Sequence, residues 1–555
     1  MPSLVGIDWI VISLYFVAVF AVAYWAYVRE KKDGTSEGYF LAGRNVGWFV
    51  VGASLFASNI GSEHLIGLAG TGASSGVAVG QFEILASLIL LLLGWLFVPF
   101  YIKSGVFTMP EFLERRYSPA ARWYLSVISI IGYVLTKISV TIYAGGIVFE
   151  TLMGISFWTG ALVVVVITGI YTIMGGLRAV VYTDMIQMFV LIGGSVVVSV
   201  VGLGAVGGWS ELRAAAGSGF FNLWKPISDP AFPWTGILFG APILGVWYWC
   251  TDQFIVQRTL SAKNLDHARR GTIFAGYLKL LPLFIFVIPG VIAYVLVQQG
   301  QMTLGSSDQA LPALVGFLLP AGLRGLVVAG LLAALMSSLS AVFNSCSTLI
   351  TWDIYKKLKP AASERQLVWV GRMSTGVLVL LGLLWIPLMQ NISGQLYQYL
   401  QSVQAYIAPP IAAVFLVGIM WKRINSQGAI ASLILGFVLG AARLILELAN
   451  GQTRDGLAAG SIGEVVAEIN FLHFAVYLFL ICLVALVVVS LLTPAPPHDK
   501  VKGLTFATAE ESVAGVDRQA ISVQVETSPI WRRRDLWLSA GVVLLVAALW
   551  MYFSG

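Results

Sequence analysis

Five ionisable side chains lie inside long apolar stretches of this sequence: Glu83, Lys137, Asp184, Asp252 and Lys279. A charged group at the centre of a membrane helix costs about 2.5–3.5 kcal/mol on insertion scales, so such residues mark substrate or ion paths by default. Glu83 either accepts hydrogen bonds from a hydroxylated ligand or reaches water at the interface. Lys279 has apolar sequence on both sides and is the stronger functional candidate, although a long lysine side chain near a helix end also extends to the interface.

The second apolar stretch is interrupted at residues 57–64 by Ala-Ser-Asn-Ile-Gly-Ser-Glu-His. In hydrocarbon, an unwound segment is tolerated only where it lines a cavity or is buried in protein. A second interruption falls at residues 245–253, where Tyr248 and Trp249 either stack on a ligand or serve packing. Two such breaks predict a ligand site near the membrane midplane, because freed backbone groups and half-helix ends bind ions and polar substrates in transporters.

Other residues near the breaks have both a ligand-binding and a structural explanation. His64 either donates to a polar ligand or is a hydrogen-bonded residue packed between helices. Ala334, Ser337 and Ser338 lie at i, i+3 and i+4 on one helical face, a spacing of small residues that usually serves close helix packing. They form a site for a hard monovalent cation only if carbonyls freed at 57–60 face them.

The elements that must position these residues are membrane helices. Of the 555 residues, 58% are hydrophobic and 11% charged, whereas roughly a quarter are charged in soluble proteins. A bilayer is spanned by about 20 apolar residues. Fourteen stretches near that length begin around residues 9, 47, 80, 124, 158, 180, 237, 271, 326, 368, 395, 428, 472 and 536.

The positive charges give these spans an orientation. With the N-terminus outside and strict alternation, 26 of the 33 lysines and arginines fall in cytoplasmic connections, as the positive-inside rule requires. Both termini are then expected outside. The cytoplasmic connections are 29–46, 101–123, 177–179, 256–270, 355–372, 421–424 and 493–535. This asymmetry also accounts for the net charge of +6, so no nucleic-acid partner is needed to explain it.

Several classes of function are disfavoured. The four histidines and three cysteines have no metal-ligand spacing, and the chain contains no phosphate-binding glycine loop or nucleophile elbow. We therefore expect that the protein is not an enzyme. The cysteines fall in predicted spans, so disulfides are not expected either.

The predicted spans divide the chain into five parts. The first helix and its loop cover 1–46, and a transport core of two five-helix repeats covers 47–420. The repeats are 47–204 and 237–420, joined by the exterior loop 205–236. Accessory helices cover 421–493, a mobile cytoplasmic linker 494–535, and the last span 536–555.

Several ordered stretches resemble the sodium/solute symporters and, within them, the sodium/glucose cotransporters. They run from about residue 38 to 493. They are Ser58–Ser62 with His64, Gly67–Gly72, Tyr101–Gly105, Tyr182–Asp184, Trp247–Gln253, Gly276–Leu280, Gly322–Leu326, Met336–Leu339, Phe343–Ser345, and Tyr399–Gln401 before Pro409-Pro410. The short 298–325 connection lacks the cysteines of animal members, so the chain resembles a bacterial member in an inner cell membrane.

The resemblance implies an all-α, LeuT-type inverted repeat with flanking helices, working by alternating access. It places sugar contacts on Asn59, His64, Glu83, Trp249, Lys279 and Gln401, with Tyr248 as the inner gate. It places sodium on the carbonyls of Ala57, Ile60 and Ala334 and the hydroxyls of Ser337 and Ser338. A second sodium would use Asp184 and Ser340, but Ala341 supplies no further hydroxyl, so that site stays open.

The expected function is sodium-coupled import of a hexose of the glucose or galactose type. One alternative is a symporter for myo-inositol or another polyol, although Ser338 stands where inositol carriers tend to have an acidic residue. Another is a glucose-gated sensor that does not accumulate sugar. The sugar, sodium and the lipid bilayer are the expected partners, and the oligomeric state is left open.

Overall fold

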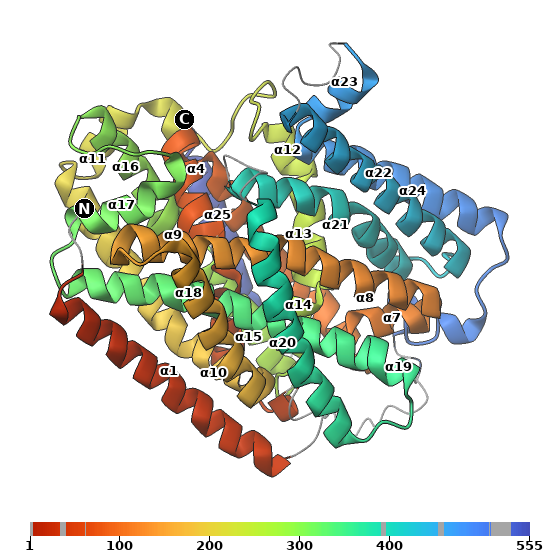
Figure 1. Ribbon diagram of the computed structural model, residues 1–555. Helices are drawn as coiled ribbons and strands as arrows, with labels where there is room; N and C mark the ends of the chain where they lie inside the picture. Colours follow the sequence, from red (N-terminus) through yellow and green to blue (C-terminus); the bar gives the residue numbers. More distant parts are fainter. Residues whose placement is uncertain are drawn as a thin grey trace.

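The protein is almost entirely helical. A computed structural model describes residues 4–33, 40, 42–61, 63–389, 396–452, 460–509, 511 and 534–554. Within these residues, β structure is limited to three isolated bridges. Figure 1 shows α1 along one flank of the helix bundle and α22 and α24 on the opposite flank, with α10, α14, α15 and α18 between them. The all-α class expected from the sequence is confirmed.

The helices follow the apolar stretches of the sequence. The α-helices are α1 (Gly6–Asp33), α3 (Trp48–Asn59), α4 (Ala69–Ser75), α5 (Gln81–Leu92), α6 (Val98–Ser104), α7 (Met109–Arg116), α8 (Pro119–Tyr133), α9 (Ser139–Met153), α10 (Phe157–Ala205), α11 (Trp209–Ala216), α12 (Trp234–Phe239), α13 (Ala241–Val246), α14 (Gln253–Leu260), α15 (Leu265–Leu278), α16 (Ile288–Gln298), α17 (Ala310–Leu318), α18 (Leu323–Thr348), α19 (Lys356–Leu358), α20 (Glu364–Met389), α21 (Leu396–Met420), α22 (Ser426–Gln452), α23 (Ile462–Glu468), α24 (Phe471–Leu492) and α25 (Arg534–Tyr552).

Short π-helices interrupt several of these spans. They are η2 (Glu63–Leu68), η4 (Leu93–Phe97), η5 (Val134–Ile138), η7 (Trp247–Thr251), η8 (Leu283–Val287) and η10 (Leu349–Tyr355). A π turn widens the helix by one residue and is found frequently at functional sites. Three of these segments, η2, η5 and η7, carry residues that the sequence singles out.

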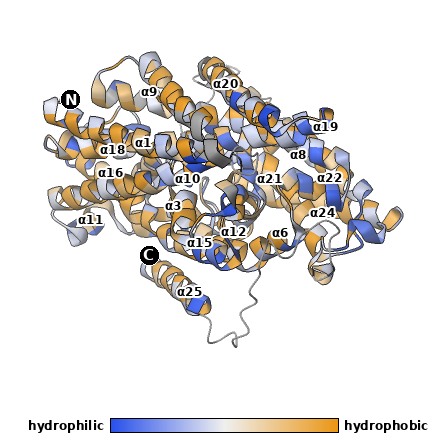
Figure 2. Ribbon diagram, turned by 90° about the horizontal axis from the view of Figure 1, so that it is seen from below, coloured by the Kyte–Doolittle hydropathy of each residue, from blue (hydrophilic) through white to orange (hydrophobic). Residues whose placement is uncertain are grey.

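The chain spans a membrane many times. Eleven helices in the described part are long and apolar enough to cross a bilayer, and 48–59 and 157–170 are shorter apolar helices. The stretch predicted near residue 237 is present as the broken run α12, α13, η7 and α14. Figure 2 shows hydrophobic residues along most of the length of outer helices such as α1 and α24. All three cysteines are buried free thiols.

Helix α10 differs from the sequence expectation. The sequence predicts two spans with a short connection at 177–179, whereas the chain continues as one 49-residue helix from Phe157 to Ala205. No proline occurs between these residues, so every backbone donor remains for the helical ladder. Positive charge at Arg178 alone is therefore no evidence for a loop.

Connections predicted on the same side of the membrane contact one another. On the expected exterior side, the Asp8 carboxylate accepts from the backbone N–H of Gly322 at 2.7 Å. On the expected cytoplasmic side, Lys357 donates to Glu114 at 2.8 Å. On the same side, Arg423 donates to the Thr493 carbonyl at 2.8 Å. Strict alternation of spans predicts this segregation, and which side faces the cytoplasm stays a prediction.

The first part of the expected mobile linker is folded. Residues 494–509 form the 3₁₀ turns η11 (His498–Lys500) and η12 (Phe506–Thr508), and Val501 and Leu504 between them are buried. The ring of Phe506 lies 5.5 Å from that of Phe100 in α6. Apolar residues between the prolines and charges thus anchor this segment to the bundle. The rest of the linker, 510 and 512–533, lies outside the described residues.

Candidate functional site

Both predicted helix breaks are present. Helix α3 ends at Asn59, and Ile60 adopts an extended conformation with φ −76° and ψ 95°. The chain becomes helical again in η2, while Ser62 lies outside the described residues. The second break is at Asp252, where φ is −79° and ψ 130°, and its carboxylate caps α14. The last carbonyls before each break lack partners within their helix, which makes them available to ligands.

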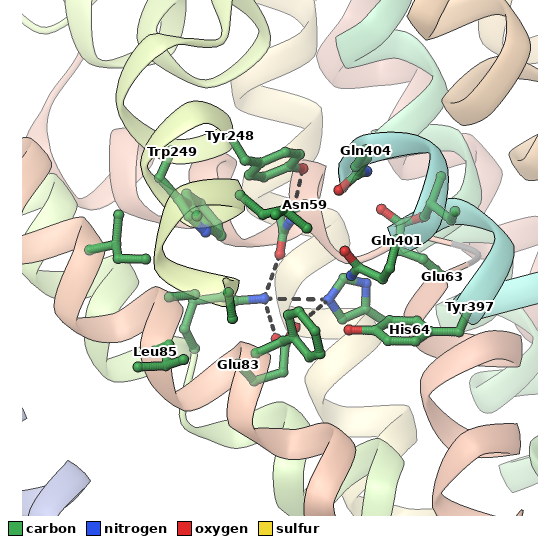
Figure 3. A pocket seen from close by; sticks show the side chains of 18 residues that line it. Asn59, Glu63, His64, Glu83, Leu85, Tyr248, Trp249, Tyr397, Gln401 and Gln404 are labelled. Carbon is green, nitrogen blue, oxygen red and sulfur yellow. Dashed lines mark hydrogen bonds and ion pairs between the residues drawn. The ribbon is translucent and has the colours of Figure 1, made fainter. Parts of the chain in front are cut away.

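A cavity lies between the two breaks. All seven residues predicted to contact a substrate line it: Asn59, His64, Glu83, Tyr248, Trp249, Lys279 and Gln401. They come from α3, η2, α5, η7, the end of α15 and α21, and Figure 3 shows the labelled ones converging on one space.

The Lys279 ammonium is the centre of a buried hydrogen-bond network. It forms an ion pair with one oxygen of Glu83, and it donates to Asn59 Oδ1 at 2.5 Å. It also lies 3.4 Å from His64 Nε2, which in turn is 3.0 Å from the other Glu83 oxygen. Lys279 and Glu83 are both buried, which is tolerated because the two opposite charges are paired.

Tyr248 joins this network to a further lysine. Its hydroxyl accepts from Asn59 Nδ2 and from Lys137 Nζ, each at 2.8 Å. The Lys137 ammonium also lies 4.1 Å from the ring centroids of Tyr248 and Phe254. The sequence pointed to Lys137 only as a charge in an apolar stretch. Its contact with the expected inner gate could not be inferred, because η5 and η7 are more than a hundred residues apart.

The cavity wall contains polar and apolar residues. The sequence analysis did not assign Glu63, Tyr397 or Gln404, yet each lines the cavity. Figure 3 shows them on the side of Gln401, away from Trp249 and Leu85. The lining also includes the apolar residues Phe82, Leu85, Ala86, Ile89, Ala241 and Leu244. A ligand in the cavity therefore meets both hydrogen-bonding groups and hydrocarbon.

The expected sodium ligands lie where two helices meet. Ser338 in α18 donates to the carbonyl of Ser58 at 3.0 Å, so Ser338 directly faces the end of α3, whereas the Ser337 hydroxyl donates to Asp184. Ala57, Ile60 and Ala334, whose carbonyls complete the expected set, are all buried. The condition set by the sequence, that the break must face the serine pair, is met for Ser338. That these atoms bind sodium stays a prediction.

The residues expected for a second sodium are engaged in other contacts. Asp184 accepts from Ser337 and from Ser54, both at 2.6 Å, and Arg258 lies 3.8 Å from it. The Ser340 hydroxyl donates to the Ser337 carbonyl at 2.9 Å. Asp184 therefore touches a residue assigned to the first ion. The structure places the two expected ion sites side by side and leaves their separate occupancy a prediction.

A second group of buried polar residues lies beyond Tyr248. We call this group the polar layer. It consists of Asp252, Gln253, Gln257, Asn344, Thr351 and Asp353. Each has at least one buried polar side-chain atom without a hydrogen-bond partner among the described residues.

Hydrogen bonds connect members of the polar layer to neighbouring residues. Gln257 donates to Thr348 at 2.8 Å, one helical turn after Asn344. Gln253 accepts from the backbone N–H of Met109 at 2.9 Å. Thr108, the residue before Met109, donates to Asp353 at 2.8 Å. The layer therefore extends from the second break toward the 101–123 connection.

The described residues give no indication of a metal site built from acidic, histidine or cysteine side chains. Within the described residues, no group of three or more His, Cys, Asp and Glu side chains is arranged to hold a metal ion. A monovalent cation bound by carbonyls and hydroxyls, as expected here, does not need such a group.

Comparison with known proteins gives a consistent result. A family model described as "Sodium:solute symporter family" matches residues 39–436, more than half of the chain. Sodium/glucose cotransporter 1 of Oryctolagus cuniculus is 40% identical over 556 residues, covering 94% of this chain and 84% of that protein. Sodium/myo-inositol cotransporter 2 of Mus musculus is 42% identical over 542 residues, covering 92% and 80%.

Two solved structures share the fold. A substrate-bound, outward-open Na⁺-coupled sialic acid symporter has a TM-score of 0.76 at 24% identity, covering 88% of this chain and 99% of that one. Mhp1, a nucleobase-cation-symport-1 family transporter, has a TM-score of 0.52 at 15% identity, covering 83% and 97%. The fold is thus the LeuT-type fold of sodium-coupled symporters, as the family resemblance implies.

Proposed function

Because the chain belongs to the sodium:solute symporter family, we propose that it imports a hexose of the glucose or galactose type together with sodium across the inner cell membrane. The observation that carries the proposal is the single cavity in which all seven expected sugar contacts meet. Relatives named as sodium/glucose cotransporters, about 40% identical over most of the chain, support the same substrate class.

The chemistry of the cavity suits a polyhydroxylated ring. Each sugar hydroxyl both donates and accepts, so it matches a wall where Lys279 and Asn59 offer donors and Glu83 offers acceptors. Trp249, 5.5 Å from the Lys279 ammonium, offers a flat face for the apolar side of the ring. Binding exchanges the internal bonds of the network for bonds to the sugar, which keeps the buried charges hydrogen-bonded throughout.

Sodium is the second cargo of the proposed cycle. The carbonyls of Ala57, Ile60 and Ala334 with the hydroxyls of Ser337 and Ser338 would hold it, since a hydroxyl that donates to a neighbour still has oxygen lone pairs to offer. The ion would join α18 to the broken helix α3 next to Asn59, which lines the cavity. Ion and sugar binding would therefore be coupled reciprocally.

The driving force is sufficient for accumulation. One sodium ion moving across about 100 mV supplies roughly 2.3 kcal/mol, and a tenfold concentration gradient adds about 1.4 kcal/mol. Together these would sustain a sugar ratio of several hundred. A second ion at Asp184 and Ser340 would square that limit, so the number of ions per cycle matters for physiology.

Uptake of sugar into proteoliposomes tests the proposal. We expect sodium-dependent accumulation that disappears when sodium is replaced by potassium. Ser337→Ala should raise the sodium concentration required, whereas Ser345→Ala, a serine further along α18 that donates to its own helix, should not. A sugar-evoked current without accumulation would instead identify a sensor.

A polyol substrate is the second candidate, because a sodium/myo-inositol cotransporter is 42% identical to this chain over 542 residues. Competition by glucose, galactose, fucose and myo-inositol in the same vesicles separates the two. Stronger competition by myo-inositol than by any hexose would replace the hexose proposal.

A further inference from the structure

Glu63 is a carboxylate on the cavity wall that the function described so far does not use. It is the first residue of η2, immediately after the break, and it is 9% exposed. Figure 3 shows its side chain beside Gln401 and Tyr397. It therefore faces the space in which the sugar is proposed to bind.

The same carboxylate also reaches the expected sodium site. A Cβ atom added to Gly61 would lie 2.7 Å from Glu63 Oε2 and 2.6 Å from the hydroxyl oxygen of Ser338. The two oxygens thus flank one point, and Ser338 is the residue that bonds the carbonyl of Ser58 across the break. Glu63 therefore lines the cavity and also lies near Ser338 of the expected ion site.

The charge of Glu63 acts on both buried lysines. It attracts the ammonium groups of Lys137 and Lys279. Lys137 donates to the hydroxyl of Tyr248, and Lys279 holds the sugar-site network together. If this carboxylate moves or is neutralised, the electrostatic attraction on Lys137 at the gate and on Lys279 in the network changes.

We propose that Glu63 couples the cation to the cavity by adding a full negative charge to an ion site otherwise built from neutral oxygens. Before the ion binds, the carboxylate interacts with the lysines. Once a cation occupies the point beside Ser338, the carboxylate turns toward it, and its hold on Lys137 and Lys279 weakens. The force on Lys279 in the sugar-site network and on Lys137, which donates to Tyr248, then changes. The inference rests on the proposed function, since it specifies how one of its two sites affects the other.

Glu63→Gln tests this inference because it removes the charge and keeps the size of the side chain. Two quantities are measured on purified protein: direct binding of ²²Na⁺ without sugar, and sugar binding at saturating sodium. Coupling free energies of 1–3 kcal/mol correspond to about 5–150-fold. We expect sodium affinity to fall about tenfold, with sugar affinity at saturating sodium changed less than about twofold.

Two further variants make the result decisive. Glu63→Asp retains the charge and should keep sodium affinity within about threefold of the wild type, which shows that folding is not the cause. Glu211→Gln removes an exposed carboxylate of α11 and should change neither quantity. Unchanged sodium affinity in Glu63→Gln, or a loss confined to sugar affinity, would overturn the inference.

The outcome is separable from the proposed function. If the wild type binds sodium but accumulates no sugar, the transport proposal fails while the sodium affinities of the three variants still test Glu63.

Discussion

The cavity and the polar layer contain similar buried polar groups, but they satisfy them differently. In the cavity, Lys279, Glu83 and Asn59 bond one another, so the site is held together before any ligand arrives. Beyond Tyr248, the polar atoms of Asn344 have no partners among the described residues. A buried polar atom without a partner costs about 1–3 kcal/mol. Water or cargo that enters the layer therefore makes new hydrogen bonds to it. A ligand in the cavity instead replaces hydrogen bonds that already exist.

The largest expected effect comes from breaking the cavity network. Lys279→Met leaves the buried Glu83 carboxylate without its lysine partner, which should destabilise the fold by about 3–5 kcal/mol and abolish sugar uptake. The double variant Glu83→Gln/Lys279→Met should recover thermal stability in detergent but not uptake. If Lys279→Met melts like the wild type, the network is not the stabilising feature described here.

A smaller effect separates binding from stability in the same cavity. Gln401→Ala should weaken sugar binding about tenfold, because one hydrogen bond of roughly 1.4 kcal/mol is lost. Its melting temperature should not change, since Gln401 is only partly buried. Gln299→Ala, at an exposed position, is the control for truncation itself. Equal sugar affinity in both variants would remove Gln401 from the site.

A substitution in the polar layer should raise the stability of the fold, whereas breaking the cavity network lowers it. Asn344→Leu replaces unpartnered polar atoms with hydrocarbon, so we expect a gain of about 1–2 kcal/mol in stability. Turnover should fall about threefold, roughly 0.7 kcal/mol in barrier, because the layer loses a polar side chain that could bond the cargo. Met336→Leu on the same helix is the matched control. Lower stability with normal turnover would show that the layer is ordinary packing.

The smallest effect is expected at the end of the layer. Arg122 bridges Asp353 at 2.6 Å and Glu114 at 2.5 Å. Burial raises the pKa of Glu114, but hydrogen bonds from Lys357 and Arg122 outweigh it and lower the pKa below its ordinary value. The contribution is thus fully present at neutral pH and is lost as pH falls through the lowered pKa.

Unfolding measurements at two pH values check this linkage. Glu114→Gln should differ from the wild type by no more than about 1 kcal/mol at pH 7, since the pair is partly exposed. The difference should vanish once the pH lies below the lowered pKa. A difference that grows on acidification would contradict the assigned direction.

The sequence was sufficient for features that depend on local pattern. The interruptions at 57–64 and 245–253 are visible because polar and glycine residues are costly inside apolar spans, and both breaks are found near those positions. The sequence singled out Glu83 and Lys279 separately as costly charges in apolar stretches, but it did not predict that they form an ion pair. Their convergence in one cavity came from the family resemblance, because spacing alone does not bring α5 and α15 together.

Features that depend on packing could not be predicted. Nothing in the chain locates Lys137 against Tyr248, because such a contact is set by how two π-helices face each other. Glu63 was visible as part of the break, yet its position beside Ser338 depends on the close approach at Gly61. The folded start of the linker was missed because Val501 and Leu504 are too few to produce a periodic pattern.

The three buried cysteines have a practical consequence. Because Cys250, Cys346 and Cys482 are all shielded from solvent, a thiol introduced on the surface would be the most accessible one in an otherwise native chain. Pairs of fluorophores or spin labels attached across the 101–123 and 355–372 connections would then report distances directly. Opening and closing of the protein could be followed during a single turnover without first rebuilding its interior.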